Sequence, residues 1–256
     1  MSAAAGSRFL RLNRQYVIGI ILLMTITILS VLFAVTLVFL ALSRMAVERI
    51  ETHHYLQRAD FFQRYPVQQG DIVFLGDSIT DGGCWEELFP GVPLKNRGIN
   101  ADNTRGVLER LDDILRPQPR AIFLLIGTND LPWYTYLNDR AILHTYNQIL
   151  DRCRALAPDA VVHVQSLLPR QRIYAARILR INAHLETMAS RHGYPFINLF
   201  PAFADRQGAL RADLTNDHLH LMAEGYALWV SILKPYIEQL HNENVNSALP
   251  SPGFNP

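Results

Sequence analysis

The sequence predicts an α/β fold in which a five-stranded parallel sheet carries helices on both faces, preceded by an N-terminal transmembrane helix. Continuous apolar runs at Ile72–Leu75 and 121–126 are typical of strands that are buried on both faces of a parallel sheet. Amphipathic helical segments separate such runs, which is the pattern of a sheet covered by helices on both sides. The 27 residues from Tyr16 to Leu42 contain no charge and are long enough to cross a bilayer.

Composition excludes some classes of function. The 256 residues include 24 basic and 23 acidic side chains, so the net charge of +1 does not indicate a nucleic-acid binder. Cys84 and Cys153 lack metal-ligand spacing. A disulfide between them is allowed if the chain lies outside the cytoplasm, whereas two free thiols are the commoner arrangement.

The segment 16–42 is interpreted as an uncleaved signal anchor. It exceeds the apolar region of a signal peptide, although Ala41-Leu42-Ser43 resembles a cleavage site and keeps cleavage open as an alternative. Three arginines and no acid precede the span within residues 1–15. This basic bias predicts a cytoplasmic N-terminus and a domain outside the membrane, which means the periplasm if the chain is bacterial.

Three further regions follow the span. Residues 43–70 are interpreted as a polar, solvated stalk or linker. Its helical part is expected to end at Pro66. Residues 71–241 form the predicted catalytic domain. Residues 242–256 are polar and proline-rich, which predicts a disordered tail.

Within the domain, strands and helices alternate in order. The first strand ends at Gly76, where glycine permits a sharp turn. Thr104 is a candidate cap for the helix after the second strand. The remaining expected strands are 94–97, 121–126, 161–166 and 195–198, and the expected helices cover 104–115, 142–156, 178–189 and 222–240.

Polar clusters follow several of these elements, and parallel strands bring their carboxyl ends to one edge of the sheet. Each cluster alone is weak, because an Asn after a strand is usually a turn residue and an Asp near a His is usually a surface pair. Together they supply what ester hydrolysis needs. Ser78 is the candidate nucleophile, His220 the base and Asp217 the group that orients it. The backbone N–H groups of Ser78 and Gly98 and the amide of Asn129 are candidate oxyanion donors.

The chain resembles the SGNH (GDSL) hydrolase family over about residues 71–240. The matching blocks are Gly76-Asp-Ser-Ile-Thr80, Asn96-Arg-Gly98, Gly127-Thr-Asn-Asp130 and Asp217-His-Leu-His220. It looks most like the acetylhydrolase and lysophospholipase members. The resemblance implies a flavodoxin-like α/β/α sandwich, no metal or cofactor, and attack by serine on a carboxylic ester. It assigns the family's serine, glycine, asparagine, acid and histidine to Ser78, Gly98, Asn129, Asp217 and His220.

One position departs from the family pattern. Relatives commonly carry glycine after the acid, and this chain carries His218. A second imidazole therefore lies two residues from the expected base and is an alternative to it, although a surface histidine is the commoner interpretation. Asp77 and Asp130 are expected to be structural rather than catalytic.

The sequence narrows the substrate only in part. Arg172, in the arginine-rich segment 167–180, is a candidate contact for an anionic group, and a solvated helix face is the alternative. Trp133 and Tyr134 are candidates for an apolar or sugar-stacking wall, or for loop packing. A membrane tether suits O-acetylated glycans or lysophospholipids as the ester substrate. The competing functions are a non-catalytic binding module of the same fold and a cytoplasm-facing thioesterase.

Overall fold

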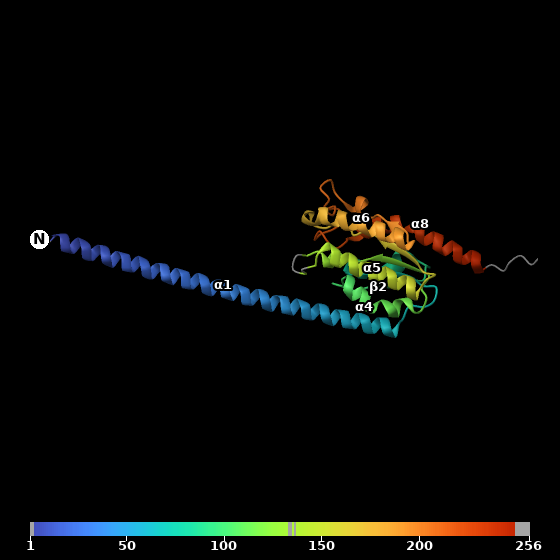
Figure 1. The fold of residues 1–256 in the computed structure, drawn as a ribbon, viewed down its shortest axis with the longest axis horizontal. Coiled ribbons are helices and arrows are strands. Elements are labelled where there is room, and N and C mark those ends of the chain that lie inside the picture. Colours follow the sequence, from blue (N-terminus) through green and yellow to red (C-terminus); the bar gives the residue numbers. More distant parts are fainter. Residues whose placement is uncertain (1–2, 133–134, 136, 249–256) are drawn as a thin grey trace, which may run out of the picture. The chain divides into compact units, whose positions relative to one another are not determined.

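Five parallel strands form one sheet in the order β2-β1-β3-β4-β5. The computed structural model describes residues 3–132, 135 and 137–248 (Figure 1). This strand order is that of a flavodoxin-like doubly wound fold, and it reverses direction between β1 and β3. The fold class expected from the sequence is therefore confirmed. The strands are β1 (Ile72–Gly76), β2 (Leu94–Gly98), β3 (Ala121–Leu125), β4 (Val161–Gln165) and β5 (Phe196–Ile197).

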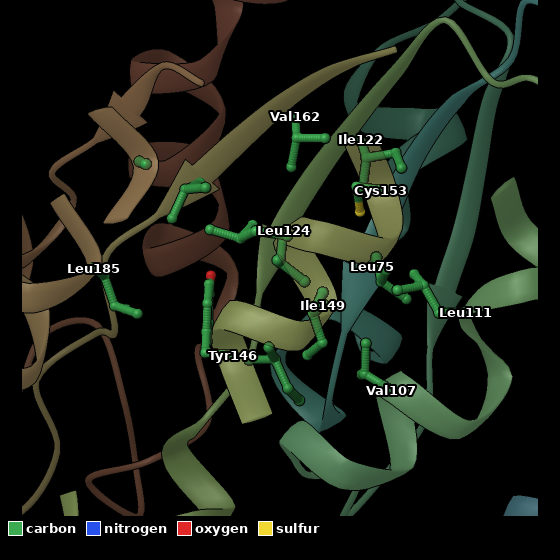
Figure 2. Packing of buried hydrophobic residues seen from close by; sticks show 14 of the residues in the cluster. Leu75, Val107, Leu111, Ile122, Leu124, Tyr146, Ile149, Cys153, Val162 and Leu185 are labelled. Atoms are coloured by element: carbon green, nitrogen blue, oxygen red, sulfur yellow. The ribbon is translucent and has the colours of Figure 1, made fainter. Parts of the chain in front are cut away.

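Helices cover both faces of the sheet. On one face α4, α5 and α6 pack through their apolar stripes onto alternate residues of the strands. Figure 2 shows Leu111 of α4 beside Leu75 and Cys153 of α5 beside Ile122. On the other face α8 and the three short helices α2, α3 and α7 pack around Phe74 and Phe123. The helices of the domain are α2 (Ser78–Asp81), α3 (Trp85–Leu88), α4 (Thr104–Leu115), α5 (Asp139–Leu156), α6 (Ala175–His192), α7 (Phe200–Phe203) and α8 (Ala223–Ala248), with 3-10 turns η1 (Thr128–Asp130) and η3 (Arg172–Tyr174).

The chain begins with one long helix, α1 (Ala3–Arg64). It ends two residues before Pro66, as expected. Within it, Tyr16–Leu42 is the segment of the described chain that is long and apolar enough to cross a membrane, with a mean hydropathy of 2.8 and no residue buried. Length and composition of this kind fit either an anchor or a signal sequence.

The last turns of α1 contact the domain. The chain divides into two compact units, and the second begins at His54 rather than at residue 71. Arg97 of β2 donates a hydrogen bond of 2.6 Å to the carbonyl of Tyr65, and its guanidinium lies 4.5 Å from the centre of the Phe62 ring. Residues 54–64 are helical, as expected for the stalk, and in this structure they and Tyr65 also contact the domain, which helical periodicity does not reveal.

The C-terminal helix also runs further than expected. α8 extends to Ala248, so residues 242–248 are helical and not a disordered tail. These residues contain no helix breaker, because the prolines of the C-terminal segment begin at Pro250. Residues 249–256 lie outside the described part of the chain. Cys84 is exposed and Cys153 is buried in α5, and both are free thiols, so the disulfide considered above is absent.

A histidine lies in the core without a polar partner. His163 of β4 stacks on Phe123 at 4.4 Å between ring centres and meets Tyr236 edge-on. Both of its ring nitrogens are buried and make no hydrogen bond. Burial lowers the pKa of His163 from 6.5 to about 4, because the charged imidazolium has nothing to replace its water.

We expect His163→Leu to remove an acid sensitivity of the fold. Between pH 6.5 and about 4 the unfolded chain binds a proton that the folded chain rejects, so the free energy of unfolding falls as the pH falls. The loss from this one group is at most about 3 kcal/mol. Urea unfolding at pH 7 and pH 4.5 measures it. The variant should lose less stability between the two pH values than the parent, whereas the exposed His144→Leu should behave like the parent. An equal loss in parent and His163→Leu would contradict this assignment.

Candidate active site

Ser78 begins a single turn of helix directly after β1. The preceding residue, Asp77, caps this turn, since its side chain accepts a hydrogen bond of 3.0 Å from the backbone N–H of Ile79. Asp77 is fully buried. Burial raises its pKa to about 7, and the nearby charges of Asp102 and Asp130 add to the effect. The cap is a structural role of the kind expected for Asp77.

Side chains from three other elements hold the carbonyl groups of this turn. A one-turn helix has few hydrogen bonds of its own, so its position depends on such external partners. α2 is thereby fixed against α3, β2 and α8. The bonds run from Tyr226 Oη to the carbonyl of Ile79 at 2.8 Å, from Trp85 Nε1 to that of Thr80 at 2.9 Å, and from Asn96 Nδ2 to that of Asp81 at 3.0 Å.

Ser78, His220 and Asp217 form one chain of hydrogen bonds. Ser78 Oγ lies 3.0 Å from His220 Nε2, although the two residues are 142 positions apart in the sequence. His220 Nδ1 lies 2.6 Å from Asp217 Oδ2. An imidazole that donates from Nδ1 to a carboxylate has Nε2 free to accept the serine proton. The structure thus brings together the three residues that the sequence singled out.

The loop before α8 fixes the Asp217 carboxylate. Its Oδ1 accepts hydrogen bonds of 2.8 Å from the backbone N–H groups of Leu219 and His220, and Thr215 Oγ1 lies 3.2 Å away. Partial desolvation raises the pKa of Asp217, but the hydrogen bonds from His220 and Leu219 outweigh it and lower the pKa to about 2. The carboxylate is therefore ionised throughout the neutral range.

His218 occupies a left-handed position in the same loop. Its φ is +62°, a conformation that favours glycine over residues with a Cβ. Its backbone N–H donates to Thr215 Oγ1 at 3.0 Å, and its side chain is exposed. The imidazole that contacts Ser78 belongs to His220.

Asn129 lies in η1, directly after β3. Its Nδ2 donates to the carbonyl of Asp102 at 2.8 Å, which joins η1 to the loop that follows β2. Asp130 strengthens this connection, since its carboxylate accepts hydrogen bonds from both the N–H and the hydroxyl of Thr104. Thr104 is consequently the first residue of α4 and not its cap, and Asn103 caps the helix instead.

Gly98 allows a close contact between β2 and α2. A Cβ at this position would lie 2.2 Å from the backbone nitrogen of Asp81, so only glycine allows β2 to approach α2 so closely. Its N–H already donates to Asn96 Oδ1 at 2.9 Å. In this structure that hydrogen is engaged by Asn96, and the role of Gly98 as an oxyanion donor stays a prediction.

In the part of the chain that the structure describes, a backbone N–H group without a hydrogen-bond partner lies three residues further on, at Ala101, a position that the sequence analysis did not consider. Ala101 has a φ of +61° in a turn that the Asp102 N–H closes onto the carbonyl of Ile99. Within the described residues its N–H has no hydrogen-bond partner, and the neighbouring Asp102 carbonyl holds the Asn129 amide. An alanine carries no signal for a left-handed conformation, and the turn-forming Asn100 was the available clue.

The structure gives little support to the three residues that were expected to contact the substrate. Trp133 and Tyr134 lie outside the described residues. Arg172 is exposed in η3. Its neighbours in the segment 167–180 are structural, since Arg177 pairs with Asp139 at 2.7 Å and Arg170 donates to the carbonyl of Thr128 at 2.9 Å.

A doubly wound sheet with Ser, His and Asp joined at its carboxyl edge defines a serine hydrolase of the α/β type. Comparison with known proteins gives the family. Residues 74–228, more than half of the chain, match the GDSL-like Lipase/Acylhydrolase family, and the chain belongs to it. Members of this SGNH/GDSL esterase family hydrolyse carboxylic esters.

Individual relatives are distant. The platelet-activating factor acetylhydrolase IB subunit alpha1 of Rattus norvegicus is 28% identical over 202 residues, which is 72% of this chain and 82% of the relative. A solved structure from Streptococcus pneumonia, described as that of a platelet activating factor, is 26% identical with a TM-score of 0.71 and covers 77% of this chain and 99% of its own. A GDSL-like lipase from Bacteroides thetaiotaomicron shares the fold with a TM-score of 0.63 at 24% identity, covering 72% and 97%.

Proposed function

We propose that this chain is a membrane-anchored serine esterase that uses Ser78, His220 and Asp217 as its catalytic triad. The observation that supports it most strongly is the unbroken chain of hydrogen bonds from Ser78 Oγ through the His220 ring to Asp217. His220 takes the proton of Ser78 as the serine oxygen attacks the ester carbonyl, and Asp217 holds the imidazole in the required tautomer. His220 then gives the proton to the departing alcohol, and a water molecule activated by His220 releases the acid from the acyl-enzyme.

The developing oxyanion needs donors that point at the reacting carbon. We propose the backbone N–H of Ser78, the amide of Asn129 and the N–H of Ala101 in place of Gly98. The support for Ala101 is its unpaired N–H beside the carbonyl that anchors Asn129, whereas the Gly98 N–H is engaged by Asn96.

Asn129→Ala is expected to lower kcat by about 10²–10³, the loss seen when one oxyanion donor is removed from other acyl-transfer enzymes. The fold should survive, because the only hydrogen bond that the substitution removes in the described structure is the one to the Asp102 carbonyl, worth about 1 kcal/mol. Steady-state kinetics on a small ester, with a thermal melt of the same sample, measure both effects. A folded variant with turnover near that of the parent would remove Asn129 from the oxyanion site.

The anchor and its orientation complete the proposal. The apolar span 16–42 is proposed to stay attached, with the N-terminus in the cytoplasm and the catalytic unit outside. A topology reporter fused after the C-terminus, expressed beside a cytoplasmic control, tests the side. Activity of the reporter in the cytoplasm would place the domain there and favour the thioesterase alternative. Recovery of a chain that starts after Ser43 would show cleavage.

We propose either O-acetyl groups on an envelope glycan or lysophospholipid-type esters as the substrate. The name of the acetylhydrolase relatives supports a short acyl group. Full-length protein in detergent, assayed on p-nitrophenyl acetate and on a long-chain ester beside Ser78→Ala, tests this. Acetate hydrolysis that disappears in the variant supports the proposal. A preference for the long chain would exclude the O-acetyl alternative in favour of lysophospholipid-type esters, and equal activity of parent and Ser78→Ala would overturn the serine mechanism.

A further inference from the structure

The last turns of α1 contact the far end of the turn that carries Ser78. Asp81 is the last residue of α2, and its carboxylate lies between two basic side chains of α1. His54 Nε2 is 3.1 Å from Asp81 Oδ2, and Arg58 Nη2 is 2.9 Å from Asp81 Oδ1. The Arg58 and Asp81 side chains are only 26% and 18% exposed. Water therefore screens this pair less than it screens a surface ion pair, whose contribution is usually small.

A second contact fixes the same stretch of α1 against β2. The guanidinium of Arg97, which is buried, stacks on Phe62 and donates to the carbonyl of Tyr65. Burial lowers the pKa of Arg97 to about 10, and the positive charge of Arg58 adds to this effect. Two arginines are thus held near each other in a partly desolvated place. The Asp81 carboxylate is the anion that pairs with Arg58 there.

Backbone hydrogen bonds connect the end of α2 at Asp81 to its start at Ser78. The Asp81 N–H donates to the carbonyl of Asp77 at 2.8 Å, and the Gly82 N–H donates to the carbonyl of Ser78 at 3.0 Å. The two ends of α2 therefore move as one unit. The carbonyl groups of α2 are held by the side chains of Tyr226, Trp85 and Asn96. The Asp81 side chain connects the same turn to α1.

We propose that His54 and Arg58 are positioning residues for Ser78 that act through Asp81. The helix that continues from the apolar span would then be a working part of the catalytic site rather than a spacer. This inference rests on the proposed esterase function. His54 and Arg58 lie before all four of the sequence motifs that match the esterase family.

The test compares Arg58→Ala with the parent in the full-length protein in detergent, assayed on p-nitrophenyl acetate. We expect kcat to fall about tenfold with KM within twofold, because small displacements of a nucleophile reduce turnover more than binding. Arg58→Lys, which keeps the charge, should recover most of kcat. Arg105→Ala is the matched control, since it removes the same charge from an exposed pair with Glu109 on α4 and should leave kcat unchanged.

Two further measurements separate positioning from general damage. In an Asp81→Asn background, Arg58→Ala should cause little additional loss, because both changes break the same contact and their effects are not additive. Amide hydrogen exchange of residues 78–82 should accelerate in Arg58→Ala and stay at the parent rate in Arg105→Ala. The exchange measurement requires no turnover, so it tests the positioning of the turn independently of esterase activity.

Several results would overturn the proposal. These are a kcat of Arg58→Ala within twofold of the parent, an equal loss in Arg58→Lys, an undiminished loss in the Asp81→Asn background, or unchanged exchange at residues 78–82. If the parent hydrolyses no ester while Arg58→Ala still accelerates exchange, the esterase proposal fails and the contact between α1 and the Ser78 turn stands as structural only. If the parent is an esterase and Arg58→Ala changes nothing, the positioning proposal fails alone.

Discussion

His220→Ala is expected to lower kcat by about 10⁵–10⁶, whereas His218→Ala should stay within about threefold of the parent. The two histidines lie two residues apart in one exposed loop, so the pair is its own matched control. Only His220 reaches Ser78 Oγ, at 3.0 Å, and also contacts Asp217. Without that imidazole nothing takes the serine proton, and the residual rate comes from the oxyanion donors and from binding alone.

The His218 position adds a second, separable expectation. Because its φ is +62°, His218→Gly should relieve backbone strain and raise the free energy of unfolding by about 1 kcal/mol, with little change in kcat. Kinetics on a small ester together with denaturant unfolding of the three variants provide both quantities. A large loss of kcat in His218→Ala, with His220→Ala still active, would reverse the assignment of the base.

Asp217→Asn is expected to lower kcat by about 10⁴ at every pH at which the protein is folded. The asparagine keeps the shape of the carboxylate, and its carbonyl oxygen can still accept the N–H groups of Leu219 and His220 that now bind Asp217 Oδ1. What it loses is the negative charge beside His220 Nδ1, so the imidazole no longer holds the productive tautomer.

The pH dependence distinguishes this explanation from a simple structural loss. The pKa of Asp217 is lowered to about 2, so the parent carboxylate is charged across the whole working range and its stabilising contribution is lost only as the pH falls from about 4 towards 2. The parent should therefore remain the more active protein by a large factor throughout the range from pH 5 to pH 9. A variant that approaches the parent rate at one end of this range would show that the charge of Asp217 is not what matters.

Much of the fold follows from local pattern. The β1 and β3 runs are apolar at every position because both faces of the sheet are covered, and each strand was located to within a residue or two. The triad could be predicted for a related reason. Ser78 comes just after the β1 strand, and parallel strands present their carboxyl ends at one edge of the sheet. The base for a nucleophile there is therefore expected in one of the loops at that same edge.

The features that escaped prediction depend on individual side-chain contacts. Gly98 looked like a free donor, but its N–H is bound by the side chain of Asn96 two residues earlier. The end of α1 looked solvated because its residues are mostly polar, and nothing in the local sequence shows that His54 pairs with Asp81, 27 positions away. No periodicity encodes such pairs, since they form only when the sheet has placed α2 beside α1.

The most direct test of the central claim is covalent labelling of the full-length protein by a fluorophosphonate, with the modified residue identified by mass spectrometry. These reagents react with a serine whose proton a neighbouring base removes. The triad assignment predicts one adduct per chain, on Ser78, formed far more slowly in His220→Ala and at the parent rate in Arg105→Ala. An adduct on another residue, or an unlabelled Ser78 in folded protein that still hydrolyses esters, would contradict the assignment.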